Sequence, residues 1–139
     1  MKFLYALTAV ATVAVSSVEA APYTLFIYEG PEQLALRPGD DAATLAYWEA
    51  YDTFGKELAA AGVLRGGSAL TTGAPVSQIA AGASAAATEP YADSALALGG
   101  YFQIEVATDA DAIAWARKMP VIDGVVEVRA GYPVPGMAM

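Results

Sequence analysis

The chain has 139 residues, enough for one domain, and 56% of them are hydrophobic while only 16% carry a charge. This composition excludes a chain that is disordered along its whole length. The formal net charge is −8, and the 7 basic residues are scattered rather than clustered. Binding to a phosphate backbone needs clustered lysine and arginine, so we expect no nucleic acid among the partners.

The sequence contains no cysteine and no histidine. Their absence excludes disulfides, thiol chemistry, zinc sites of the usual kind and acid–base catalysis by imidazole, including a Ser-His-Asp triad. The glycine pairs at 66–67 and 99–100 lack the spacing of a phosphate-binding loop. No acidic cluster has the spacing of a Ca²⁺ or Mg²⁺ loop. We therefore expect no cofactor and no metal, and binding is favoured over chemical reaction.

Residues 1–20 have the features of a secretory signal peptide. Lys2 precedes an uncharged run over residues 3–15, and small residues follow up to Ala20. The run is shorter than the roughly 17–25 residues of a membrane-spanning helix, so cleavage before Ala21 is favoured over a retained anchor. We expect a protein exported to the periplasm or beyond, with residues 21–139 as one domain and no stable membrane insertion.

Residues 23–29 are predicted to form the first strand. Its side chains alternate, so that Leu25 and Ile27 point to one face while Phe26 and Tyr28 point to the other. A Gly-Pro pair closes the strand, because proline cannot donate a hydrogen bond to a neighbouring strand.

A loop at residues 34–38 leads to the first predicted helix. Acidic residues at 40–41 suit a helix start, because they accept hydrogen bonds from free N–H groups and complement the positive end of the helix dipole. The helix should run to about residue 61, with Gly62 as its left-handed cap. One face of this helix carries an apolar stripe at helical spacing, which consists of Tyr47, Tyr51, Phe54, Leu58 and Ala61. We interpret the aromatic residues of the stripe, together with Trp48 next to it and Trp115 of the second predicted helix, as core.

The far side of this helix carries Asp52 and Lys56, which are i,i+4 neighbours and are interpreted as a solvated pair. Gly55 lies inside the helix, where glycine is less favourable than alanine by roughly 1 kcal/mol. We interpret this glycine as a sign of close packing against another element.

Residues 63–70 predict a second strand, weakened by the glycines at 66–67, and a turn follows at 71–75. Residues 76–80 and 84–88 form either a hairpin or a loose loop, because this part of the chain is rich in alanine, glycine and serine. The sequence leaves both readings open.

The strongest strand prediction covers residues 99–106, where two glycines are followed by strict alternation. One side is apolar, and the other carries an aromatic ring, an amide and a carboxylate. Such a surface is typical of a cavity or a subunit contact. The apolar side consists of Phe102, Ile104 and Val106, and the opposite side consists of Tyr101, Gln103 and Glu105.

Asp109 is the predicted cap of a second helix, which Pro120 ends. Residues 125–129 predict the last strand, and residues 132–139 form a tail rich in proline and glycine. On that strand Val126 and Val128 share one face, while Glu127 and Arg129 share the other.

With the hairpin set aside, the predicted order is β-α-β-β-α-β, the split arrangement of α+β ferredoxin-like folds. Each helix has one apolar stripe, so both should cover the same face of the sheet. The aromatic side chains on the other face predict a homodimer, which closes an α+β barrel by packing sheet against sheet.

Five stretches of the sequence, in this order and spacing, resemble the YCII-related family in its DGPF branch. The resemblance covers nearly all of residues 22–130 and implies the dimeric α+β barrel. The stretches are residues 23–30, 88–93, 99–102, 109–120 and 126–129.

The sequence departs from the family at several places. Glu89-Pro90-Tyr91 is similar to the family's Asp-Gly-Pro-Phe but is one residue short, and uncharged residues at 95–97 stand where charged ones usually follow. Some YCII-like proteins are thought to be enzymes that use a His–Asp pair, an activity that a chain without histidine cannot share. The predicted signal peptide is an addition to relatives that begin near Ala21.

The candidate site residues are polar groups on the face away from the helices, with Asp93 from the loop motif as a second candidate. They form either a polar ligand pocket in the barrel or an Arg129 salt bridge that satisfies carboxylates across the dimer. Asp93 is either functional or the side chain that accepts the hydrogen bond of an Asx turn or helix cap. The face candidates are Tyr101, Gln103, Glu105, Glu127 and Arg129.

Two main functions follow, and a pure interaction module is a third. The first is an exported YCII-like homodimer that binds a small molecule without histidine-based catalysis. The alternative is a carboxylate-based lyase or isomerase that acts on a small organic molecule in the barrel cavity. An enzyme needs Glu105 and Glu127 in an open cleft, whereas a structural role has them sealed by Arg129.

Overall fold

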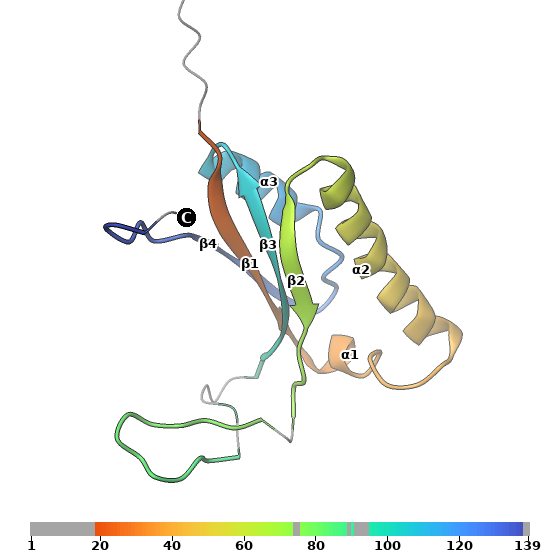
Figure 1. Ribbon diagram of the computed structural model, residues 1–139. Helices are drawn as coiled ribbons and strands as arrows, with labels where there is room; N and C mark the ends of the chain where they lie inside the picture. The colour runs from red at the N-terminus through yellow and green to blue at the C-terminus, as the bar shows by residue number, and fades with distance from the viewer. Residues whose placement is uncertain (1–18, 74–75, 89, 91–94, 138–139) are drawn as a thin grey trace, which may run out of the picture.

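The computed structural model describes residues 19–73, 76–88, 90 and 95–137, so the predicted signal peptide lies almost wholly outside the described residues. The four strands form one antiparallel sheet in the order β2-β3-β1-β4 (Figure 1). This α+β arrangement is consistent with the predicted ferredoxin-like fold. The elements are β1 (Ala21–Glu29), α1 (Pro31–Leu34), α2 (Ala42–Ala60), β2 (Leu64–Ala69), β3 (Ala97–Val106), α3 (Asp109–Arg117) and β4 (Gly124–Ala130).

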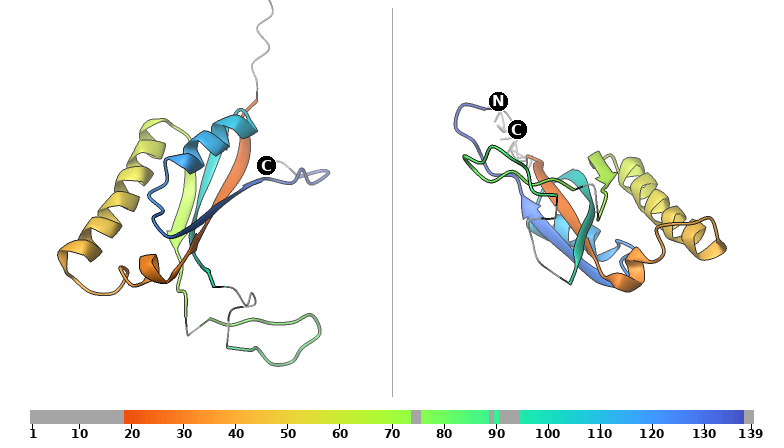
Figure 2. Two further views of the ribbon diagram at one scale, coloured as in Figure 1. Left: turned by 180° about the vertical axis from the view of Figure 1, so that it is seen from behind. Right: turned by 90° about the horizontal axis from the view of Figure 1, so that it is seen from below.

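Helices α2 and α3 cover the same face of the sheet, as their single apolar stripes predict (Figure 2). No helix covers the opposite face in the described part of the chain, and residues 76–88 and the C-terminal tail project on that side. We call this surface the open sheet face. Its side chains are Phe26, Tyr28, Tyr101, Gln103, Glu127 and Arg129.

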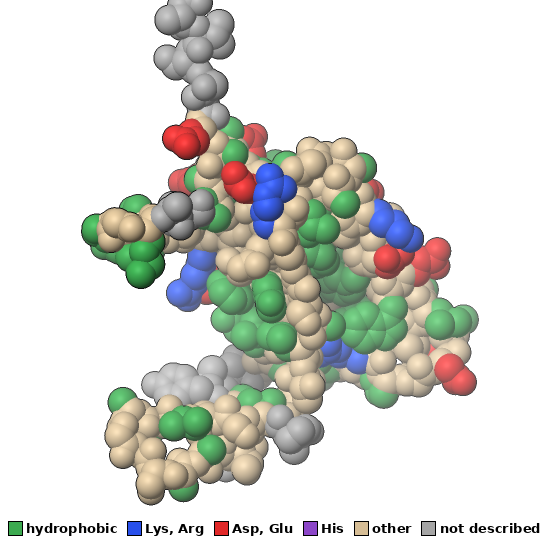
Figure 3. Space-filling view, viewed as in Figure 1, with side chains coloured by type: hydrophobic (Ala, Val, Ile, Leu, Met, Phe, Trp, Pro, Cys, Tyr) green, Lys and Arg blue, Asp and Glu red, His purple; other side chains and the backbone are tan. Residues whose placement is uncertain are grey.

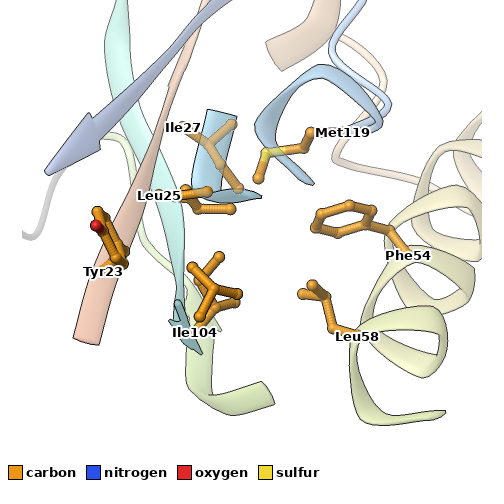
Figure 4. Packing of buried hydrophobic residues seen from close by; sticks show 9 residues of the cluster. Tyr23, Leu25, Ile27, Phe54, Leu58, Ile104 and Met119 are labelled. Carbon is orange, nitrogen blue, oxygen red and sulfur yellow. The ribbon is translucent and has the colours of Figure 1, made fainter. Parts of the chain in front are cut away.

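The hydrophobic core lies between the two central strands and the helices (Figure 4). Leu25 of β1, Ile104 of β3 and Leu58 of α2 have no exposed surface, and Phe54 is only 3% exposed. Burying such a side chain contributes about 1.5–3 kcal/mol relative to leaving it in water. The packing confirms the predicted stripe of α2 apart from Ala61, which follows the helix and is exposed.

Both predicted ends of α2 are confirmed. The Asp41 side chain accepts a hydrogen bond from the Thr44 N–H at 2.8 Å, and Gly62 has a φ of +73° in the left-handed region. A methyl group at Gly55 would lie 3.5 Å from the Phe102 ring, which is an ordinary contact. The expectation that Gly55 marks close packing is therefore wrong.

Two local predictions differ from the structure. The loop expected at 34–38 is preceded by the short helix α1, whose Glu32 N–H donates to the distant Asp123 carboxylate at 2.9 Å. Thr108, not Asp109, caps α3, because the Thr108 hydroxyl accepts from the Asp111 N–H at 3.1 Å.

Residues 76–88, for which a hairpin and a loose loop were both open, form an irregular segment with one antiparallel bridge, between Gln78 and Ala87. No helix among the described residues is long and apolar enough to cross a membrane.

Candidate functional site

A cavity of about 300 Å³ lies between α2 and the strands β2 and β3. Apolar side chains gather on both sides of β2, and those between β2 and α2 belong to the cavity (Figure 3). We call it the Glu29 pocket. Its walls are Ile27, Glu29, Arg37, Tyr47, Trp48, Tyr51 and Phe102, with Asp52 at the rim, and its floor consists of residues 67–69 and 99–101.

Glycines in both strands leave room for this cavity. Gly67 pairs with Phe102, and Gly100 pairs with Ile27, so both glycines occupy positions that face the helices. Phe102 faces the same way, because its ring packs edge-on against Phe54 of α2 at 5.2 Å between centroids. Without side chains at the two glycine positions, the floor between α2 and the sheet is backbone.

Glu29 ends β1 on the helix-facing side and is only 1% exposed. Its Oε1 accepts hydrogen bonds from Gln33 Nε2 at 2.7 Å and from the Tyr47 hydroxyl. Its Oε2 lies 3.3 Å from Arg37 Nη1 but receives no hydrogen bond. A buried carboxylate oxygen without a hydrogen-bond donor is costly, so this atom is a candidate for ligand contact.

Gln33 holds this carboxylate in place from the opposite side. Its side chain is fully buried, and Nε2 also donates to the Tyr51 hydroxyl at 2.7 Å. Its Oε1 accepts from the backbone N–H groups of Ile122 and Asp123 at 3.0 and 3.3 Å. One side chain therefore ties α1 and α2 to the turn that leads into β4, and it fixes the orientation of Glu29.

Arg37 forms the wall of the pocket next to Glu29. Its guanidinium donates to the Gly99 carbonyl at 3.1 Å and lies 5.4 Å from the centre of the Trp48 ring. Trp48 in turn donates from its indole N–H to the Arg37 carbonyl at 3.2 Å. Trp48 is 36% exposed and lines the pocket, so its interpretation as a core residue is wrong.

The glycine pair that opens β3 makes the close approach of Glu29 possible. The register between β1 and β3 shifts at Ile27/Tyr28, which leaves Gly99 as an extra residue on β3. A Cβ atom at Gly99 would overlap the Glu29 carboxylate. Only glycine fits at position 99, because the Glu29 carboxylate occupies the space that a side chain would need.

The two tyrosines next to Glu29 keep their protons at neutral pH. Burial, followed by the hydrogen bond to Glu29, raises the pKa of Tyr47 above its ordinary value. Burial, followed by the negative charge of Glu29, raises the pKa of Tyr51 to about 12. The site thus combines one carboxylate, one guanidinium and two neutral phenols in a mainly apolar cavity.

The site residues predicted on the open sheet face do not form the single cluster that the sequence predicted. Glu127 pairs with Arg129 at 2.6 Å, and both side chains are well exposed. Glu105 pairs instead with Arg65 of β2 at 2.8 Å, a partner that the sequence reasoning did not consider. Pro22 is the β1 neighbour of Glu105, whereas Phe26 is that of Glu127, so the two glutamates lie apart along the sheet.

The other predicted residues form rows across the sheet. Gln103 and Arg129 both neighbour Thr24, and Tyr101 and Glu127 both neighbour Phe26. Asp93 lies outside the described residues. A role for these side chains in ligand binding stays a prediction.

Sequence reasoning missed Glu29, although a signal was present. The alternation that places Leu25 and Ile27 on the helix-facing side also places Glu29 there. Buried tyrosines need hydrogen-bond partners, so two of them on the stripe of α2 indicate a buried polar group nearby. Arg37 has no comparable signal, because its loop shows no periodic pattern.

The described residues include no group of three or more aspartate, glutamate, cysteine or histidine side chains that could hold a metal ion. No curated protein matches the chain. A family model described as the YCII-related domain matches residues 21–134, which is most of the chain. This protein therefore belongs to the YCII-related family.

Proposed function

We propose that this YCII-related protein binds a small organic molecule in the Glu29 pocket, without histidine-based catalysis. The observation that carries the proposal is Glu29 Oε2, a buried carboxylate oxygen in the wall of the cavity that receives no hydrogen bond. The mainly apolar lining with a few polar groups also supports it, because ligand pockets usually combine the two.

The proposal is tested by nuclear magnetic resonance titration with phenol and anisole. Saturable shifts are expected for the Trp48 indole N–H and for the amides of Gly99 and Gly100. Ala69 pairs with Gly100 and is exposed, so Ala69→Leu should fill the pocket and abolish the shifts without unfolding the chain. Ala59→Leu, at an exposed position of α2, is the matched control. Shifts confined to the open sheet face would contradict the proposal.

We further propose that the protein is a homodimer of the DGPF branch, paired through the open sheet face. Phe26, Tyr28 and Tyr101 are only half-buried there, and aromatic side chains of this kind are enriched in interfaces. Paired sheets would form the α+β barrel, with a Glu29 pocket on the outer side of each sheet.

Export is also part of the proposal. The short apolar run of residues 3–15 and the small residues before Ala21 support a cleaved signal peptide. Mass spectrometry of the exported protein should find Ala21 at the N-terminus. A full-length chain retained in the cell would contradict export.

A carboxylate-based lyase or isomerase is the second candidate, and Glu29 is now the residue that favours it. Oε2 accepts no hydrogen bond, so once Arg37 turns aside it could take a proton from a carbon of the substrate and return it, while the Tyr47 hydroxyl donates to Oε1. The probe is cyclohexanone in heavy water. Deuterium should enter next to its carbonyl faster with the wild-type protein than with Glu29→Gln, and equal rates would exclude this chemistry.

A further inference from the structure

We infer that the Glu29 pocket selects an uncharged single-ring compound with a hydroxyl group, of the phenol type, and that this hydroxyl binds between Glu29 and Arg37. The inference rests on the proposed function, since it names the class of ligand for the same cavity. Three features of the pocket carry it: the Glu29–Arg37 contact, the shape of the cavity, and its balance of charge.

The contact between Glu29 and Arg37 suits a group that both donates and accepts. Glu29 Oε2 needs a donor, and Arg37 Nη1 lies 3.3 Å away without forming a hydrogen bond to it. A hydroxyl donates one hydrogen bond and accepts others, so one O–H group placed between them satisfies both. An ether can accept from Arg37 but cannot donate to Glu29.

The Arg37 side chain must turn to admit the hydroxyl, because Oε2 is closed off from water. It has room to do so. Arg37 also borders a second, more open hollow of about 550 Å³, which Leu34 and Pro38 line as well. The guanidinium can therefore move toward that hollow while it stays within reach of the hydroxyl oxygen.

The size and lining of the cavity fit one ring. An apolar cavity of about 150 Å³ is enough to bind benzene, and this one measures about 300 Å³. The aromatic side chains of Tyr47 and Trp48 form one wall, and the bare backbone of Gly67 and Gly100 forms the floor. A flat ring can contact both the aromatic side chains and the backbone at the two glycines, and the small methyl group of Ala69 leaves it room.

The charges favour a neutral ligand. Glu29 and Arg37 balance each other inside the pocket, and Asp52 at the rim is paired with Lys56 at 2.5 Å. A carboxylate ligand would lie beside Glu29, and an ammonium ligand would lie beside Arg37. Either repulsion is strong where little water can screen it.

The test compares four probes of similar size on the full-length protein: phenol, anisole, benzoate and benzylammonium. Dissociation constants come from the nuclear magnetic resonance titrations of the pocket amides. Phenol is expected to bind at least about tenfold more tightly than anisole, since hydrogen bonds to a charged group are the stronger kind. Benzoate and benzylammonium should bind more weakly than phenol.

Variants locate the effect. Glu29→Gln should bring the phenol and anisole constants close together, whereas Glu49→Gln, at an exposed position of α2 outside the pocket, should leave their ratio unchanged. If Glu29→Gln fails to fold, the comparison of probes on the wild-type protein still decides.

The outcomes separate this inference from the proposed function. Equal binding of phenol and anisole in the pocket overturns the inference but keeps the pocket as a binding site. Tighter binding of either ion than of phenol overturns the requirement for an uncharged ligand. If none of the four probes shifts the pocket amides, both the inference and the proposed function are wrong.

Discussion

At the scale of single residues, the Glu29 carboxylate explains the glycines around it. Gly99 approaches Glu29 so closely that no side chain fits between them, and the shifted register of β3 provides this approach. Gly55, by contrast, lies where a methyl group would make an ordinary contact with Phe102. A side chain is therefore excluded at Gly99 but not at Gly55, and alanine substitutions should have opposite effects on stability at the two positions.

Gly99→Ala should destabilise the protein by about 1–3 kcal/mol, because the added methyl group displaces the Glu29 carboxylate from its hydrogen bonds. Gly55→Ala should stabilise it by about 1 kcal/mol, because alanine is the better helix former and space is present. Urea unfolding measures both. A neutral Gly99→Ala would mean that Glu29 does not occupy the position described.

Gln33→Glu should be among the most damaging substitutions at a single site. It replaces an N–H donor, 2.7 Å from Glu29 Oε1, by an oxygen that carries negative charge. An uncompensated buried charge costs about 3 kcal/mol or more, which thermal unfolding at neutral pH would detect. Glu32→Gln at the exposed neighbouring position is the control and should unfold like the wild type. Equal stability of the two variants would contradict the Gln33 network.

At the scale of the elements, α2 contributes two tyrosines whose pKa values are raised in the folded state. Unfolded tyrosines lose their protons near pH 10. Between that pH and about 12, where Tyr51 ionises in the folded state, the unfolded chain binds fewer protons, so stability falls as pH rises. Below pH 10 the contribution of both tyrosines is fully present.

Spectrophotometric titration should show tyrosinate from Tyr47 and Tyr51 only well above pH 10. The free energy of unfolding of Tyr51→Phe should fall less steeply with pH over the same range, because one of the two tyrosines with a raised pKa is missing. Tyrosines that all titrate together near pH 10 would contradict the buried positions.

The elements that could be predicted are those with a clear period. The alternation in β1 and β3 and the stripe of α2 predicted their faces correctly, down to the Asp41 and Gly62 caps. Helix α1 could not be predicted, because it has only four residues and one of its N–H groups, that of Glu32, donates to the Asp123 carboxylate far along the chain.

The candidate site was missed because its polar groups come together only through tertiary packing. Glu29 had the right alternation, but Arg37 comes from a loop without a pattern and Gln33 from an unpredicted helix. Glu105 and Glu127 were grouped because they share a face, and strand register then placed them apart. Which face a residue occupies follows from a period of two, whereas which residues are neighbours follows from register and connection.

At the scale of the whole molecule, helices cover one face of the sheet, and no helix of the described residues covers the other, where we propose that a second copy binds. If the proposed dimer forms, Tyr101→Glu should leave a folded monomer, because it places a charge in the centre of the open sheet face. Light scattering distinguishes one chain from two. Ile113→Glu, on the exposed side of α3, is the control and should keep the dimer. A wild-type protein that is monomeric at high concentration would contradict the barrel.

The proposed dimer and the pocket involve different faces of the sheet, since the dimer would pair through the open sheet face and the pocket lies under α2. Phe26→Glu, which adds a charge on the open sheet face at a residue outside the pocket, should therefore abolish pairing while phenol binding persists. Loss of both together would mean that the ligand site is formed between the two copies.

A crystal structure of the protein soaked with phenol would show whether the Glu29 pocket holds the proposed ligand. One ring is expected between Trp48 and the backbone of Gly67 and Gly100, with its hydroxyl within hydrogen-bond distance of Glu29 Oε2 and of the Arg37 guanidinium. A ring bound instead on the open sheet face, with the Glu29–Arg37 contact unchanged, would contradict this expectation.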